Sequence, residues 1–331
     1  MFKKEAETKN FAIIGCGGYV APRHLKAIKE TGNNLVAALD KNDTVGILDK
    51  YFYDVDFFTD FERFDRHLEK LRMMDNNNKK VDFVTICSPN YLHDAHIRFA
   101  LRIGANAICE KPIVINPWNL KSLEELEKTS GKKVYTVLQL RHHPSLIKLK
   151  EEIEREKSDK KHDIELTYIT PRGKWYDYSW KGELSKSGGV SVNIGIHFFD
   201  MLIWMFGEVK DYELHHSTKR SMAGFLELEK ARVKWFLSLD EKDMNKVKIK
   251  DKKNQSFRSI KVDGREIEFS DVFSDLHTEV YKDILAGKGF GISEAKESIE
   301  LTYKLRNAKI KEDGNFMHPL ILKNGKKIFC P

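Results

Sequence analysis

Residues 11–21 read FAIIGCGGYVA, an apolar run followed by three glycines within four positions. The run is long enough for one buried strand, and the glycines come where that strand would lead into a helix. This order is typical of a turn that binds a dinucleotide, because Gly15 permits a tight turn and Gly17 lets the backbone approach a pyrophosphate. Val20 replaces the third glycine of the usual pattern, so helix–strand packing must differ slightly there.

Beyond this turn, apolar runs alternate with amphipathic stretches as far as about residue 140. The expected strands are 11–14, 35–39, 81–87, 105–109 and 134–140, and the expected helices are 22–31, 61–74, 94–103 and 117–130. Near-continuous apolar strands separated by helices indicate a parallel sheet covered on both faces. We therefore expect residues 1–140 to form a Rossmann dinucleotide-binding domain, in a chain of α/β class.

After about residue 150 the pattern changes to strands in hairpin order. They are expected at 164–170, 209–215, 224–228, 232–239, 259–262 and 266–269, with helices at 194–206, 274–286 and 293–311. Asp263-Gly264 between two of these runs is a strong hairpin signal. We expect residues 141–331 to form an α+β domain on a mostly antiparallel sheet, which binds the substrate and makes oligomer contacts.

The bulk properties suit a two-domain cytoplasmic protein. The chain has 331 residues, and its net charge of +7 is scattered and suits a phosphate-bearing small molecule as well as a nucleic acid. No uninterrupted apolar run reaches about 18 residues, and the charged start is unlike a signal peptide, so we expect no membrane span. Of four cysteines, Cys16, Cys87 and Cys109 lie in apolar runs, which favours reduced thiols, and no cysteine pair has metal-site spacing.

Two further segments follow strands at the edge where open α/β sheets bind ligands. Asp40 ends the second strand, where its carboxylate would accept hydrogen bonds from a ribose and repel the 2′-phosphate of NADP. Ser88-Pro89-Asn90 closes a later strand, and Asn90 would line the nicotinamide side. The alternatives are an ordinary turn with a surface aspartate, and a loop with Asn90 or His93 near a helix cap. The glycine turn, the second strand and Asp40 at its end together predict that the cofactor is NAD rather than NADP.

Glu110-Lys111-Pro112 ends the run at 105–109. The position puts a lysine at the ligand-binding edge of the sheet, and the proline fixes the turn because its ring locks φ. A lysine and proline at a strand end more often form only a turn. The dinucleotide turn upstream and the histidine segment downstream favour a functional lysine.

That downstream segment is Asn193-Ile194-Gly195-Ile196-His197, which leads into an apolar helix stopped by Gly207. On a helix Asn193 and His197 are four residues apart and share a face. A single histidine on an apolar helix is more often a packed core residue. The glycine-rich approach and Lys111 favour a catalytic role instead.

Three stretches together, 15–20, 110–112 and 188–200, resemble the Gfo/Idh/MocA family of sugar oxidoreductases. The stretches GYVAPRH (18–24), CSPNYLH (87–93), LQLRHH (138–143) and NIGIHF (193–198) are similar to one branch, the UDP-N-acetyl-D-glucosaminuronate 3-dehydrogenases of O-antigen biosynthesis. The similarity covers about residues 10–310. Asn193 stands where the broader family often has aspartate, so the acid–base role of that carboxylate does not transfer to this chain.

The resemblance implies a bacterial enzyme that uses NAD to oxidise the sugar 3-hydroxyl of UDP-N-acetyl-D-glucosaminuronate to a ketone, for lipopolysaccharide O-antigen biosynthesis. It also implies a homo-oligomer, a dimer or a tetramer, with neither a nucleic-acid nor a membrane partner. Some relatives retain NADH on purification and reoxidise it with 2-oxoglutarate.

The expected site residues form a catalytic pair, a cofactor-binding set and a substrate-binding set. His197 is the expected general base, since an imidazole titrates near working pH, and Lys111 would donate a hydrogen bond to the developing alkoxide, although the two roles could be exchanged. Arg172 is the expected anion clamp, with a surface arginine as the alternative. The residues expected to bind NAD are Gly15, Gly17, Gly18, Tyr19, Val20, Asp40, Ser88, Pro89, Asn90, His93, Glu110, Lys111 and Gln139. Those expected to bind the substrate are Lys111, Arg172, Tyr176, Asn193 and His197, and no metal is expected.

Two alternatives stay open. The enzyme could act on UDP-N-acetylglucosamine or another NDP-hexose, or the fold could serve as a dinucleotide sensor without turnover. The presence of both Lys111 and His197 argues against a sensor, because a sensor need not keep a base.

Overall fold

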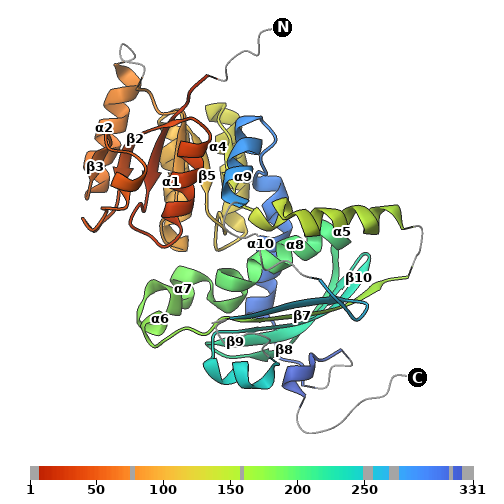
Figure 1. Cartoon of the computed structure of the whole chain (residues 1–331). Coiled ribbons are helices and arrows are strands. Elements are labelled where there is room, and N and C mark those ends of the chain that lie inside the picture. Colours follow the sequence, from red (N-terminus) through yellow and green to blue (C-terminus); the bar gives the residue numbers. More distant parts are fainter. Residues whose placement is uncertain are drawn as a thin grey trace. The chain divides into compact units, whose positions relative to one another are not determined.

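The computed structural model describes residues 7–74, 79–156, 160–248, 256–267, 276–312 and 316–322. The chain divides into two compact units (Figure 1). Unit 1 takes in residues up to 142 together with those from 273 to 296, and unit 2 takes in residues 143–272 and those from 297 onward. Unit 1 thus differs from the predicted first domain, residues 1–140, because it includes a later segment.

Unit 1 is built on a six-stranded parallel sheet in the order β3-β2-β1-β4-β5-β6. The strands are β1 (Asn10–Ile14), β2 (Asn34–Leu39), β3 (Asp56–Phe58), β4 (Phe83–Ile86), β5 (Asn106–Cys109) and β6 (Val134–Thr136). The predicted Rossmann sheet is confirmed. The edge strand β3 was not predicted, because three residues are too few to establish a periodic pattern.

Helices cover both faces of this sheet. On one face α2 (Phe61–Met73), α3 (His93–Arg102) and α4 (Trp118–Ser130) pack together, with Phe64 of α2 and Phe99 of α3 in ring contact. On the other face α1 (Ala21–Glu30) lies beside α9 (Leu276–Leu285), as Figure 1 shows.

The helix predicted at 274–286 was assigned to the second domain, and that assignment is wrong, because α9 belongs to unit 1. Residues 274 and 275 lie outside the described residues. In the structure Val280, Tyr281 and Ile284 of α9 pack into one core with Phe11 of β1 and Ile108 of β5. The rings of Tyr281 and Phe11 stack at a centroid distance of 5.8 Å. A parallel sheet needs apolar cover on both faces, and α9 supplies what the local helices leave open.

Unit 2 holds a second six-stranded sheet in the order β12-β11-β7-β10-β9-β8. The strands are β7 (His162–Ile169), β8 (Val209–Ser217), β9 (Ser221–Leu228), β10 (Ala231–Ser238), β11 (Phe257–Val262) and β12 (Arg265–Glu266). β7 and β10 pair in parallel, and the other pairs are antiparallel, so the predicted mostly antiparallel sheet is confirmed. The last two residues of the strand predicted at 266–269 lie outside the described residues.

The helices of unit 2 include α5 (Pro144–Arg155), α6 (Trp175–Tyr178), α7 (Leu184–Ser187) and α8 (Ile196–Phe206). The longer α10 (Ile292–Asn307) begins in unit 1 and belongs to unit 2 from residue 297 onward. Phe199 of α8 meets Trp235 of β10 edge-on, with ring centroids 5.2 Å apart. By length and composition the helical stretch Leu184–Phe206 would suffice to cross a membrane, but 72% of its most apolar window is buried. Such burial is equally typical of a core helix.

The described cysteines, Cys16, Cys87 and Cys109, are free thiols, and Cys330 lies outside the described residues. Burial raises the pKa of Cys16 to about 12 and holds the pKa values of Cys87 and Cys109 well above the usual range. These three side chains therefore stay protonated at neutral pH.

Substitution of Gly15 tests the geometry of the turn between β1 and α1. It has a φ of +86°, and a Cβ there would lie 2.8 Å from the carbonyl carbon of Cys87. Gly15→Ala should lower the free energy of unfolding by about 2–4 kcal/mol, because left-handed strain adds to displaced backbone. Gly131 is the matched control, since its φ is +66° and nothing lies within 4 Å of the added Cβ. Gly131→Ala should cost only about 1 kcal/mol in denaturant unfolding, and equal losses would contradict the close approach.

Candidate active site

The glycine turn joins β1 to α1 and is fixed by the end of β2. The Gly15 N–H donates to the Leu39 carbonyl at 2.7 Å, and the Gly17 N–H donates to Oδ2 of Asp40 at 2.9 Å. The other carboxylate oxygen of Asp40 accepts from the Asn42 N–H at 3.0 Å. Two backbone donors therefore hold Asp40 beside the turn, in the position from which it was predicted to meet a ribose.

The turn also has the properties of an anion site. Gly17 is exposed, no side chain caps α1, and the N–H groups of Tyr19 and Val20 have no acceptor among the described residues. Free N–H groups at a helix start attract phosphate, because the helix dipole adds to the hydrogen bonds. The residues present therefore fit the diphosphate of a dinucleotide.

The segment Ser88-Pro89-Asn90 lies in the loop after β4, and His93, three residues further on, begins α3. His93 is only 1% exposed, and its Nδ1 lies 2.6 Å from the Pro112 carbonyl while its Nε2 lies 2.7 Å from the Ser88 carbonyl. Burial lowers the pKa of His93, and the two carbonyls oppose that shift. The ring thus bridges the loops after β4 and β5. Its predicted contact with the cofactor stays a prediction.

Gln139 begins the short helix η4 (Gln139–His142) after β6. Its side chain is buried, and its Oε1 has no hydrogen-bond partner among the described residues. A buried amide oxygen without a donor costs about 1–3 kcal/mol. The carboxamide of a nicotinamide would supply such a donor, which supports the predicted cofactor role.

Glu110-Lys111-Pro112 follows β5 at the carboxyl edge of the sheet. The Lys111–Pro112 peptide bond is cis, Lys111 is partly exposed, and the Glu110 N–H donates to the Ile86 carbonyl at 3.0 Å. The lysine is therefore on the side of the sheet where a bound nicotinamide is expected.

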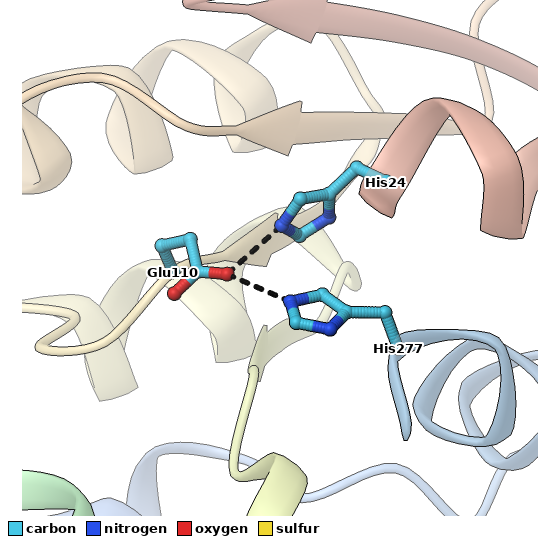
Figure 2. Close-up of side chains that lie close together, drawn as sticks. All are labelled: His24, Glu110 and His277. Atoms are coloured by element: carbon cyan, nitrogen blue, oxygen red, sulfur yellow. Dashed lines mark hydrogen bonds and ion pairs between the residues drawn. The ribbon is translucent and has the colours of Figure 1, made fainter. Parts of the chain in front are cut away.

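The Glu110 side chain, by contrast, is buried between two histidines (Figure 2). Its Oε1 lies 2.9 Å from Nε2 of His24 on α1 and 3.2 Å from Nε2 of His277 on α9. Burial raises the pKa of Glu110, but the two histidine hydrogen bonds outweigh it and hold the pKa well below the usual range. Sequence reasoning missed this cluster: His24 lay in a stretch of family similarity without an assigned role, and His277 carried no signal.

In unit 2 the structure brings two predicted substrate residues together. Asn193 Nδ2 donates to the hydroxyl oxygen of Tyr176, which is 3% exposed and whose pKa burial raises. Asn193 lies in the π-turn Ser191–Gly195, and the partly exposed His197 follows in the first turn of α8. The four-residue spacing therefore spans the junction of a π-turn and an α-helix. Single π-turns are frequent at functional sites.

Arg172 lies exposed in the loop before α6. Arg220, which sequence reasoning missed, holds this loop: it donates to Asp177 and to Asp240 at 2.7 Å each, and to the Arg172 carbonyl. Burial lowers the pKa of the nearby Lys181, and the charge of Arg172 lowers it further. Neither Arg172 nor Lys181 forms an ion pair within the described part of the chain, so both charges are available to an anion.

The two units match separate family descriptions. Residues 9–138 match an oxidoreductase family with an NAD-binding Rossmann fold, and residues 150–233 match the C-terminal alpha/beta domain of the same family. Among curated proteins, the chain is 28% identical to myo-inositol 2-dehydrogenase of Thermotoga maritima over 128 residues, and 30% identical to the protein YteT of Bacillus subtilis over 131 residues. These matches cover 39% of this chain in both cases, and 37% and 31% of those proteins' own lengths, respectively.

Solved structures match over nearly the whole chain. The WlbA (WbpB) dehydrogenase from Thermus thermophilus is 49% identical, and the match covers 95% of this chain and 100% of that one. The TM-score is 0.87 for its complex with NAD and alpha-ketoglutarate and 0.88 for its complex with NAD and UDP-GlcNAcA. The WlbA dehydrogenase from Bordetella pertussis, at 17% identity over 91% of this chain and 96% of its own, shares the fold with a TM-score of 0.73.

Asp40 is expected to set the choice of cofactor. Asp40→Ala should weaken NAD binding about 10- to 100-fold, because a hydrogen bond to a charged group contributes about 1.5–3 kcal/mol. NADP binding should weaken less, since the repulsion of its 2′-phosphate is removed as well. Titration calorimetry with both nucleotides checks this, with Asp43→Ala as the exposed control. Equal losses for NAD and NADP would contradict a ribose contact.

Proposed function

The chain belongs to the Gfo/Idh/MocA family of NAD-dependent oxidoreductases, and we propose that it oxidises the 3-hydroxyl of UDP-N-acetyl-D-glucosaminuronate to a ketone. One observation carries the substrate: the Thermus thermophilus dehydrogenase solved with NAD and UDP-GlcNAcA is 49% identical and matched over its full length. The proposed context is the making of a lipopolysaccharide O-antigen sugar, in the cytoplasm, by a homo-oligomer.

The charges of unit 2 support a substrate with several anionic groups. UDP-N-acetyl-D-glucosaminuronate carries a diphosphate and a carboxylate, and Arg172 can bind either of them bidentately. Lys181 adds a second positive charge near Arg172. Tyr176 and Asn193, already joined by a hydrogen bond, would contact the sugar.

In the proposed reaction, NAD supplies the acceptor for the hydride that leaves C3 of the sugar. Lys111 donates a hydrogen bond to the 3-oxygen while negative charge develops there, and His197 takes the hydroxyl proton. The C3–H electron pair departs as hydride, a C=O bond forms, and the products are the 3-keto sugar, NADH and one proton. Lys111 and His197 are both partly exposed, as groups that act on a bound substrate must be.

We also propose that 2-oxoglutarate can reoxidise the NADH. The Thermus thermophilus relative has been solved with NAD and alpha-ketoglutarate. In this half-reaction the keto carbon accepts the hydride and its oxygen takes a proton, which gives 2-hydroxyglutarate and restores NAD.

The function is tested with a panel of UDP-sugars with and without the C6 carboxylate, and NADH is followed by absorbance. We expect 3-keto product only from the uronate, and continued turnover when 2-oxoglutarate is added. Faster turnover of UDP-N-acetylglucosamine would show that this sugar, and not the uronate, is the substrate. NAD binding without any sugar-dependent reduction would favour a dinucleotide sensor.

Lys111→Met tests the catalytic lysine. It should lower kcat about 100-fold or more, because an oriented donor to the reacting oxygen is lost, while NADH binding stays within a few-fold. Stopped-flow absorbance gives kcat, and fluorescence titration gives the NADH affinity. Lys121→Met, on the exposed side of α4, is the control. Near-normal turnover of Lys111→Met would rule out the assignment.

Arg172→Ala tests the anion clamp. It should raise KM about 10-fold or more with a smaller change in kcat, and Arg172→Lys should recover only part of the loss. If the guanidinium binds the diphosphate, inhibition by UDP should weaken to the same degree; if it binds the carboxylate, the preference for the uronate should shrink instead. Lys219→Ala, at an exposed position, should change neither. An unchanged KM in Arg172→Ala would make the arginine a surface residue.

A further inference from the structure

Two deeply buried histidines of unit 1, His24 and His277, have no part in the proposed reaction. They are 0% and 2% exposed. Burying a polar ring costs free energy unless its hydrogen bonds are made, and His277 keeps Nδ1 buried without a partner among the described residues. An apolar side chain would stabilise the core more at such a position. The hydrogen bonds that these histidines do form therefore need an explanation.

The ionised state of Glu110 sets the direction of two of these bonds. A carboxylate only accepts, so Nε2 of His24 and Nε2 of His277 both donate to the same oxygen, Oε1 (Figure 2). Burial lowers the pKa of His24, which favours the neutral ring. Its free nitrogen, Nδ1, then accepts from the Tyr281 hydroxyl at 2.9 Å, and that hydroxyl lies 2.8 Å from Oγ1 of Thr85. The chain of bonds links α1, α9 and β4 to the end of β5.

These contacts anchor the residues on both sides of Lys111. Before it, the Glu110 side chain is held by α1 and α9, and the Glu110 N–H is held by β4. After it, the Pro112 carbonyl lies 2.6 Å from Nδ1 of His93, whose other nitrogen meets the Ser88 carbonyl. The backbone from which Lys111 projects is thus fixed by side chains from elements that are distant in the sequence.

We infer that His24 and His277 are positioning residues for Lys111, which act through their hydrogen bonds to Glu110. The inference rests on the proposed function only for the catalytic role of Lys111. A displacement of about 1 Å at a reacting group can cost about 100-fold in rate, so anchoring of this kind has a measurable effect.

The same three side chains, His24, Glu110 and His277, are a set of potential metal ligands. Ligand atoms at about 2.0–2.1 Å from a tetrahedral zinc ion would lie about 3.4 Å apart. The observed separations from Oε1, 2.9 Å and 3.2 Å, are shorter and have the length of N–H···O hydrogen bonds. The geometry therefore favours hydrogen bonding over a shared ion.

Two matched pairs of variants test the inference. His277→Leu removes the donor at similar volume, whereas His277→Gln supplies an amide N–H in its place. Glu110→Leu removes the acceptor, whereas Glu110→Gln keeps an oxygen that can accept both bonds without the charge. We expect each leucine variant to lower kcat about 10- to 100-fold and each glutamine variant to recover most of the loss, while the His277 variants leave NADH affinity unchanged. If Glu110→Gln is as slow as Glu110→Leu, the charge and not the hydrogen bonds matters, and the inference fails.

A second readout needs no sugar. The rate of reductive methylation of Lys111 in the NADH-bound enzyme is followed against pH by mass spectrometry. We expect His277→Leu to change the rate and its pH midpoint, and His277→Gln to follow the wild type. This result would stand even if the proposed substrate were wrong.

Controls separate positioning from stability. His318, a buried histidine of unit 2 bonded to Thr167, provides the control variant His318→Leu, which should change neither kcat nor the labelling of Lys111. Lower stability of His277→Leu with unchanged kcat and labelling would reduce His277 to a structural residue. One equivalent of metal in the purified protein, lost in His277→Leu, would overturn the inference in favour of an ion site.

Discussion

A parallel sheet of apolar strands is stable only when both of its faces are covered, and this requirement organises unit 1. The helices between the strands leave part of one face open, and α9 covers it through Val280, Tyr281 and Ile284. The same helix carries His277 to Glu110. Packing of the core and placement of a histidine against Glu110, the residue before the candidate catalytic lysine, therefore both follow from the packing of α9 on the sheet.

The parallel arrangement of the strands also brings together the segments of the candidate site. In such a sheet all carboxyl ends lie on one edge, so segments far apart in the chain meet there. The glycine turn follows β1, Ser88 follows β4, Glu110 and Lys111 follow β5, and Gln139 follows β6. Three of these segments supply groups of different kinds: backbone N–H groups, a lysine and an amide. These groups suit the predicted binding of a dinucleotide and of a reacting hydroxyl.

Local patterns made much of this predictable. Apolar runs and glycines specified the Rossmann sheet, because both signals depend on neighbours in the sequence. The placement of α9 was not predictable, since which sheet a helix covers depends on surfaces formed by distant residues. The roles of His277 and Arg220 escaped for the same reason: their partners, Glu110 and Asp177, are 167 and 43 positions away. The helix α5 escaped because it lies where one pattern gives way to the other.

The presence of α9 in unit 1 also affects the order in which the two units can fold during synthesis. A domain formed from one continuous segment can finish folding while later residues are still being synthesised. Unit 1 cannot, because the face bearing Phe11 and Ile108 lacks part of its cover until residue 285 has left the ribosome. By then most of unit 2 has been synthesised as well. The cofactor-binding half of this protein is thus first in the sequence but not first to be completed.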